Sequence, residues 1–178
     1  SFQVDYTHPF SEKISMETGW KSTIDQLENN YVVDSLINNS WVESRELSSI
    51  FKYRSQIHAG YATFKQEIGS FGYQAGLRGE YFGRYFELPR TGENHSKDFY
   101  NIYPTLHLQQ KLNEKNEIQL SYSRRVFRPS TRDIDPTVHY YNANMRSRGN
   151  PDLSPEYVNS IELGHLLKWE KNSITSNI

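Results

Sequence analysis

Residues 99–127 read FYNIYPTLHLQQKLNEKNEIQLSYSRRVF. Around Leu106 apolar and polar side chains alternate, and His107 is one of the polar residues. The same alternation returns around Leu120, beside Gln119. A period of two residues places successive side chains on opposite faces of an extended chain. Both halves of this stretch are therefore predicted to be β-strands with one apolar and one polar face.

The pattern continues outward from this pair of strands in both directions. β-branched and aromatic residues fill further extended segments, while glycine and proline fall mainly between them. The predicted strands are residues 2–8, 12–27, 51–66, 71–88, 99–112, 117–127, 157–170 and 173–178. Several are longer than strands of globular proteins usually are, and long enough to cross a bilayer at a tilt. The sequence predicts an all-β fold, an antiparallel up-and-down meander of about eight strands.

The connections between these strands alternate in length. The short ones are residues 7–12, 67–70, 113–116 and 171–172, and the long ones are residues 28–50, 89–98 and 128–156. Outer-membrane barrels have short periplasmic turns and long extracellular loops, whereas a soluble sandwich has no reason to sort its loops in this way. The alternation favours a transmembrane β-barrel, although the function of the two longest loops cannot be deduced from it.

The faces of the strands are less decisive, because a half-buried sheet in water shows the same alternation. In the third strand Ile57 and Ala59 are assigned to the apolar face and His58 to the polar face. Aromatic residues near strand ends are typical of the girdles at a membrane interface. These residues are Trp20, Tyr53, Tyr81, Tyr100, Tyr157 and Trp169.

Composition excludes several classes of protein. The formal net charge is −1 and the mean hydropathy is −0.80, which leaves no helical membrane span and no electrostatic reason to expect nucleic acid. The chain has no cysteine, so it is not a disulfide scaffold. Its start lacks the features of a signal peptide, and both ends look like the interior of a longer chain. We therefore expect a fragment of a larger barrel.

Three stretches carry specific motifs. Residues 122–130, YSRRVFRPS, form a strand that ends in Arg-Pro-Ser. Residues 149–156, GNPDLSPE, contain Gly-Asn-Pro-x-Leu-x-Pro-Glu, and residues 161–164, IELG, belong to the strand that follows. In this order and spacing the three stretches resemble the C-terminal barrel region of TonB-dependent receptors and related outer-membrane β-barrels, especially those of Bacteroidetes. Residues 1–98 fit the strand pattern but carry no comparably specific motif.

The resemblance implies a location in the bacterial outer membrane and a part in the uptake of a small nutrient such as a siderophore, vitamin, glycan or peptide. The implied partners are membrane lipid and lipopolysaccharide, the receptor's own plug domain, and the TonB complex acting through that plug. This chain itself contains no plug or TonB-contacting segment. A small closed barrel that serves as an anchor or adhesin, and less favourably a barrel enzyme, are the alternatives.

Two sets of candidate residues follow. The first set consists of polar-face residues that we expect to point into the lumen and to contact the ligand or the plug. They are His58, Arg78, Glu80, His107, Arg125 and Glu162. The signature loop contains Arg128, Pro129, Ser130, Gly149, Asn150, Pro151, Pro155 and Glu156, where the prolines and glycine suit turns that hold the loop near the barrel mouth. No catalytic, cofactor-binding or metal-binding residue is predicted, and no enzyme activity.

Other interpretations of single residues stay open. The lumen charges form either a docking site or a hydrated salt network. Asp133, Asp135 and Asp152 are weak candidates for calcium, because their spacing is not that of an EF-hand. The group Arg124, Arg125, Arg128 and Arg132 either meets lipopolysaccharide phosphates or pairs with nearby acids such as Asp133. Asp135 and His139 stand near a rim where a barrel enzyme would need them.

Overall fold

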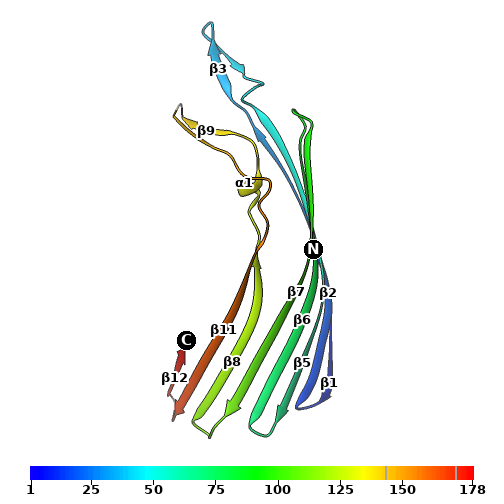
Figure 1. Ribbon diagram of the computed structural model, residues 1–178, viewed down its shortest axis with the longest axis vertical. Helices are drawn as coiled ribbons and strands as arrows, with labels where there is room; N and C mark the ends of the chain where they lie inside the picture. Colours follow the sequence, from blue (N-terminus) through cyan, green and yellow to red (C-terminus); the bar gives the residue numbers. More distant parts are fainter. Residues whose placement is uncertain (143, 171) are drawn as a thin grey trace.

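Eight antiparallel strands form one sheet in consecutive order along the chain (Figure 1). The computed structural model describes residues 1–142, 144–170 and 172–178. The strands of the sheet are β1 (Phe2–Ser11), β2 (Ile14–Tyr31), β5 (Ser49–Ile68), β6 (Phe71–Leu88), β7 (Glu93–Lys111), β8 (Asn116–Phe127), β11 (Glu156–Trp169) and β12 (Asn172–Asn177). The predicted all-β, up-and-down meander is confirmed.

The other elements lie in the connections. Two small hairpins are formed by β3 (Asp34–Ile37) with β4 (Ser40–Glu43) and by β9 (His139–Asn142) with β10 (Met145–Ser147), and α1 (Thr131–Ile134) is a single helical turn. Asn38 and Asn39 both have positive φ, as the two-residue turn between β3 and β4 requires. No helix in the described ranges is long and apolar enough to cross a membrane.

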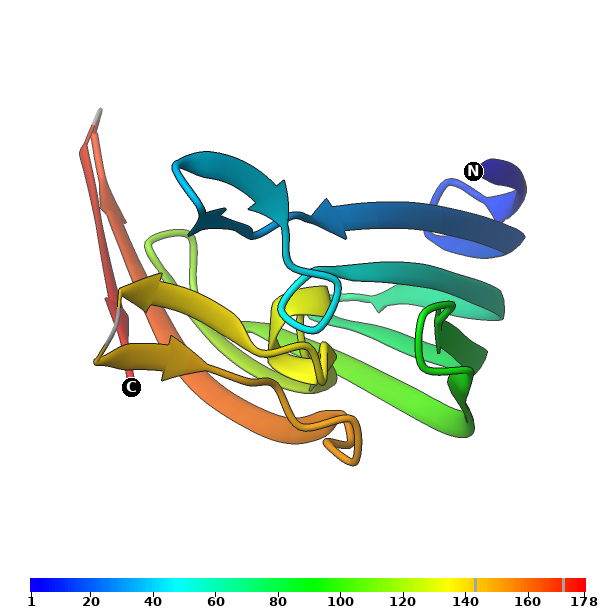
Figure 2. The same ribbon diagram turned by 90° about the horizontal axis from the view of Figure 1, so that it is seen from above.

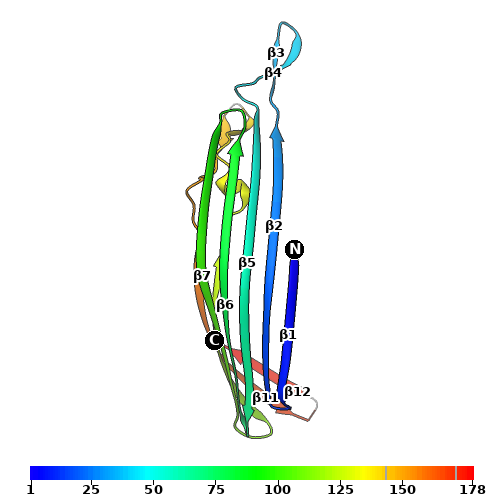
Figure 3. The same ribbon diagram turned by 90° about the vertical axis from the view of Figure 1, so that its right-hand side faces the viewer.

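The connections sort to the two ends of the sheet. Tight turns join the strands at the lower end in Figure 1, and the hairpins and α1 lie at the upper end. Figure 3 shows the β3–β4 hairpin projecting beyond the other strands. At one lower turn, Gly69 takes a φ of 61° that favours glycine. The predicted turn at residues 171–172 includes Lys171, which lies outside the described residues.

Two of the predicted long connections are shorter than expected. Residues 93–98 continue β7 and pair with residues 83–88 of β6, so only residues 89–92 connect these strands. Residues 28–31 and 49–50 likewise extend β2 and β5 as cross-strand partners. Their polar composition suggested loops, but polar residues also pair in strands that have one face in water.

The sheet is curved, and α1 with β9 lies on its concave side (Figure 2). A small apolar core joins the two: Phe51, Phe86, Leu88 and Ile134 are buried, and Tyr53 packs against them. Burying each of these large side chains contributes about 1.5–3 kcal/mol. The core fixes residues 128–155, here called the inner loop, to the concave face of the upper strands.

The convex face is apolar and uncovered. Leu163, Ile102 and Ile161 point outward with exposed fractions of 51%, 56% and 71%, instead of packing against a second layer. A soluble sandwich would bury this face. From Phe71 to Tyr81, strand β6 rises roughly 33 Å, or roughly 25 Å along a normal to the membrane at a tilt of about 40°. That height matches the apolar band of an outer-membrane barrel.

Aromatic rings mark both edges of this band. Phe64, Phe71 and Tyr73 lie together at the lower edge. At the upper edge the rings of Trp20, His58, Tyr81 and Tyr100 form a continuous row across four strands. Of the other aromatic residues expected in girdles, Tyr53 instead packs on the concave core and Tyr157 contacts Arg124.

Candidate functional site on the concave face

A charged cluster occupies the concave face of β6. Glu80 has a side chain only 5% exposed, and each of its carboxylate oxygens accepts a hydrogen bond from a different arginine. Arg78 Nη2 donates to Oε2 at 2.9 Å, and Arg128 donates to Oε1. The guanidinium of Arg128 also lies 4.9 Å from the centre of the Phe82 ring. Because residues two apart in a strand share a face, the sequence Arg78-Gly79-Glu80 places its charges side by side.

The contact between Glu80 and Arg128 joins the wall to the inner loop. Arg128 follows the last residue of β8 and precedes Pro129, which restricts it to extended conformations. The strand therefore stops here, and its terminal side chain turns toward β6. Glu80 is nearly buried, so its removal would leave Arg128 without its anion.

A second set of contacts holds the Gly-Asn-Pro segment. Arg84 Nη2 donates to the carbonyl oxygens of Pro151 at 2.9 Å and Leu153 at 2.5 Å. Lys97 Nζ lies 3.0 Å from both the carbonyl and a carboxylate oxygen of Asp152. The ammonium group of Lys97 holds the pKa of the Asp152 carboxyl below its usual range. β6 and β7 thus each supply one cation that fixes the inner loop.

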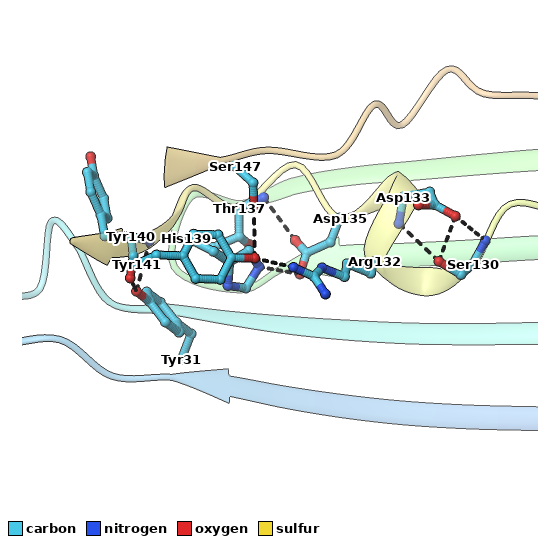
Figure 4. Close-up of polar contacts among 10 residues, drawn as sticks. All are labelled: Tyr31, Ser130, Arg132, Asp133, Asp135, Thr137, His139, Tyr140, Tyr141 and Ser147. Atoms are coloured by element: carbon cyan, nitrogen blue, oxygen red, sulfur yellow. Dashed lines mark hydrogen bonds and ion pairs between the residues drawn. The ribbon is translucent and has the colours of Figure 1, made fainter. Parts of the chain in front are cut away.

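The helical turn α1 is the local anchor of this loop. Ser130 is its N-cap: the side chain accepts from the backbone amide of Asp133, and the Asp133 carboxylate accepts from the Ser130 amide. Hydrogen bonds from Ser130 lower the pKa of Asp133. Figure 4 shows this reciprocal pair beside the other polar contacts of the loop. A capping box satisfies donors that a one-turn helix would otherwise leave free.

The Gly149-Asn150 segment docks on the open end of α1. The amide of Gly149 donates to the carbonyl of Asp135 at 2.8 Å, and the amide of Asn150 donates to that of Asp133 at 2.7 Å. A β-carbon at position 149 would lie 2.6–2.7 Å from the carbonyl oxygens of Arg132, Asp133 and Asp135. Only glycine allows this approach, which is the physical reason for the glycine of the signature.

The tip of the loop reaches β2. Tyr31 Oη donates to the Tyr140 carbonyl and accepts from the Tyr140 amide, both at 3.0 Å. Nearby, Asp135 accepts from the Thr137 amide at 2.8 Å and lies 3.2 Å from Nε2 of His139 (Figure 4). Contacts from β2, β6 and β7 therefore hold the inner loop in place.

Below the loop, a hollow of about 480 Å³ opens on the concave face. Its lining includes Lys21, Arg78, Arg124, Arg125 and the rings of Tyr61 and Tyr103. Glu80 is the one carboxylate of the lining, and both of its oxygens are already bound by arginine. The hollow therefore presents an excess of positive charge.

Most of the predicted lumen residues lie on the concave face, but His58 does not. Cross-strand register puts Arg78, Glu80, His107, Arg125 and Glu162 on the concave side. His58 pairs with Tyr81 and Ser22, and its ring stacks beside Trp20, so it lies on the convex face and its predicted orientation is wrong. The upper part of β5 turns its apolar residues inward because they meet the inner-loop core.

Two interpretations of loop residues are also corrected. Arg128 faces Glu80, and the Arg132 guanidinium lies over the ring of Tyr141, so neither points outward toward lipopolysaccharide. The proposed calcium ligands bind protein groups separately: Asp133 binds Ser130, Asp135 binds Thr137, and Asp152 binds Lys97. Within the described ranges no cluster of three acidic or histidine side chains could hold a metal ion.

Sequence reasoning missed Arg84, Lys97 and Tyr31, which anchor the inner loop from the wall. Arg84 falls at an even position of β6 in step with Arg78 and Glu80, so the period of two could have assigned it to the same face. Lys97 was assigned to one connection and Tyr31 to another. Nothing in the sequence around either residue indicated a contact with the inner loop.

Low pH is expected to loosen the inner loop. Asp133 and Asp152 have folded-state pKa values below the ordinary 3.8, so their ionised forms favour the docked loop. This stabilisation is present above about pH 3.8 and is lost as the pH falls through the lowered values. Hydrogen exchange of residues 128–155, corrected for the intrinsic rate, should rise between pH 6 and pH 3. The Asp152→Asn variant should show a smaller rise, and equal protection at both pH values would contradict the expectation.

Comparison with known proteins gives a family and a similar structure. The family described as "Outer membrane protein beta-barrel family" matches residues 1–178, the whole chain. Among solved structures, the siderophore receptor PirA from Pseudomonas aeruginosa is similar, with 11% sequence identity and a TM-score of 0.45. The similarity covers 98% of this chain and 45% of that one, so this chain spans less than half of the receptor's length. No curated protein sequence matches.

Proposed function

Since this chain belongs to the outer membrane protein β-barrel family, we propose that it forms part of the wall of a receptor that imports a small nutrient. Its location is the bacterial outer membrane, and its convex band faces lipid. The nutrient would be a siderophore, vitamin, glycan or peptide. A plug domain and, through it, the TonB complex would be the partners of the complete receptor.

The observation that carries this proposal is the inner loop. A wall that served only as an anchor would need no loop folded into its concave side, whereas a receptor uses such a loop to narrow the entrance above a binding space. Here the loop is held by Glu80, Arg84, Lys97 and Tyr31, above a cationic hollow. The arrangement supports a selective entrance.

The edges of the sheet support a larger barrel over a small closed one. In the described part of the chain, β1 pairs only with β2 and β12 only with β11. Hydrocarbon does not tolerate unpaired strand edges, so other strands must cover both. We assign Asp135 and His139 a structural role, because Asp135 accepts from the Thr137 amide and the His139 ring packs against that of Tyr31.

Growth under nutrient limitation tests the uptake role. A strain lacking the full-length gene is grown with iron chelates, cobalamin, oligosaccharides or peptides as the limiting source, and is complemented with the intact gene. Loss of growth on one class, restored by the gene, supports uptake. Normal growth on every class, together with lost adhesion to surfaces, would instead favour the adhesin alternative.

The orientation of the strands gives a separate prediction. The chain has no cysteine, so single cysteines can be introduced on a cysteine-free background of the complete protein. Asn38→Cys, at the tip of the β3–β4 hairpin, should react with a membrane-impermeant maleimide on intact cells. Asn113→Cys, in a tight turn, should react only after the outer membrane is permeabilised. The reverse labelling pattern would contradict the assigned orientation.

A further inference from the structure

The barrel wall has a slit between β7 and β8. Residues 105–111 of β7 pair with residues 117–123 of β8, but above this point β7 pairs with β6 alone. β8 instead stays with β11 up to Phe127. Residues 151–153 of the inner loop are bound to Arg84 of β6 and Lys97 of β7, above the level at which the β7–β8 pairing ends.

Pro104 accounts for the place where the ladder ends. It pairs with Leu77 in a β6–β7 register that continues without interruption, so the amide hydrogen that proline lacks is missing on the β8 side. A strand interior tolerates proline only where no neighbour needs that donor. The separation of β8 from β7 above Thr105 is thus encoded in β7 itself.

Arg124 stands in the slit. It lines the concave hollow and also a second hollow on the convex face, so the two spaces approach each other at this side chain. Its Nε is buried and has no hydrogen-bond partner among the described residues. Its guanidinium lies 4.9 Å from the centre of the Tyr157 ring, while nearby Glu80 is already bound by Arg78 and Arg128. Arg124 therefore has no ion-pair partner in the part of the chain that the structure describes.

The convex hollow is an aromatic groove of about 600 Å³. Trp20, His58, Tyr81 and Tyr100 form its upper wall, and the cross-strand pair Gly60–Gly79 lowers its floor. From β2 to β7 the groove crosses three strand spacings, roughly 14 Å. Its shape and its apolar rings suit an extended aliphatic chain.

The slit lies at the depth of the outer leaflet. From Tyr100 at the upper aromatic row to Thr105, where pairing resumes, the strand descends roughly 12 Å along the membrane normal. The lower part of the slit is thus inside the apolar band, where an unpaired charge is costly and usually has a functional partner. A water-soluble anion does not reach that depth from the lipid side, but the acid group of an amphiphile does.

We propose that the slit and groove together form a lipid-side site for a long-chain carboxylate. The aliphatic chain lies in the groove over Gly60 and Gly79, and the carboxylate pairs with Arg124 inside the slit. One unpaired guanidinium matches one carboxylate, and the planar fork suits bidentate binding. The proposal depends on the barrel assignment and not on nutrient uptake through the lumen.

Binding of a nitroxide-labelled stearate tests the site. The complete protein is placed in phosphatidylcholine nanodiscs, and quenching of tryptophan fluorescence gives the Kd, with Trp20→Phe identifying the contribution of the groove. Gly79→Val fills the groove floor, although nothing lies within 4 Å of the new β-carbon, so folding should be preserved. We expect this variant and Arg124→Gln each to raise the Kd about tenfold or more. Arg124→Gln should also remove the preference for the acid over its methyl ester.

The matched control is Ala75→Val, which adds the same side chain to the convex face of β6 outside the groove. Its Kd should stay within about twofold of that of the unchanged protein. Equal binding of the acid and the ester by the unchanged protein would overturn the proposal. An unaltered Kd for Gly79→Val would also overturn it, and this outcome does not depend on whether Arg124→Gln folds. Growth of the Gly79→Val strain on the limiting nutrient is measured separately, because growth reports on nutrient uptake and the Kd reports on binding of the stearate.

Discussion

Replacing the nearly buried Glu80 by alanine is expected to destabilise the barrel by about 3–5 kcal/mol, because Arg78 and Arg128 lose their shared anion. The Glu80 side chain is 5% exposed, and Arg78 and Arg128 both lose their partner in the variant. The inner loop also loses its contact with the middle of β6. Reversible urea unfolding of the complete protein in lipid vesicles measures the change.

The control for this prediction is Glu67→Ala. Glu67 pairs with Lys65 at 3.3 Å, but both side chains are about half exposed, so its loss should cost less than about 1 kcal/mol. A second variant, Glu80→Ala combined with Arg128→Met, removes one of the unpaired charges and should recover part of the lost stability. If Glu80→Ala costs no more than Glu67→Ala, the cluster does not hold the wall and loop together.

Substitution of Gly149 by valine is expected to release the inner loop from α1. The β-carbon would overlap three carbonyl oxygens at 2.6–2.7 Å, and the two hydrogen bonds from residues 149 and 150 would be lost as the backbone moves away. Overpacking costs about 1–3 kcal/mol, so trypsin cleavage after the exposed Arg148 should accelerate roughly ten- to hundredfold where opening limits cleavage.

Gly79→Ala provides the comparison for proteolysis. A β-carbon at Gly79 would have no atom within 4 Å, so this variant replaces a glycine without creating the steric overlap expected at Gly149. Its cleavage rate should equal that of the unchanged protein. A Gly149→Val variant with an equally slow rate would mean that the segment is held by Arg84 and Lys97 alone.

The alternation of apolar and polar side chains predicted the fold, because each strand of the barrel wall has one apolar and one polar face. Leu106 and Leu120 were assigned to apolar faces, and both lie on the convex side. The same rule failed at His58, because it equates the apolar face with the lipid face. In the upper part of β5 the apolar residues Phe51 and Tyr53 face the inner loop, and the period of two then places His58 on the opposite, convex face.

The candidate site was predicted only in part. Arg-Pro-Ser and Gly-Asn-Pro were found as loop motifs from local chemistry, since proline and glycine restrict their own backbone. Their partners in the wall were not found, because Arg128 and Glu80 are 48 residues apart and Arg84 is 67 residues from Pro151. Nothing local to either residue specifies such a distant contact.

The hydrogen bonds between Tyr31 and Tyr140 have a consequence for the order of assembly. These residues are 109 positions apart in the chain, and β5, β6, β7 and β8 lie between them. The two tyrosines can meet only after those strands have paired in register, since closing so long a loop in a disordered chain is entropically unfavourable. The hydrogen bonds of Tyr140 with Tyr31 of β2 therefore report that the intervening hairpins are complete. Protection of the Tyr140 amide should be one of the last events as the chain inserts and folds.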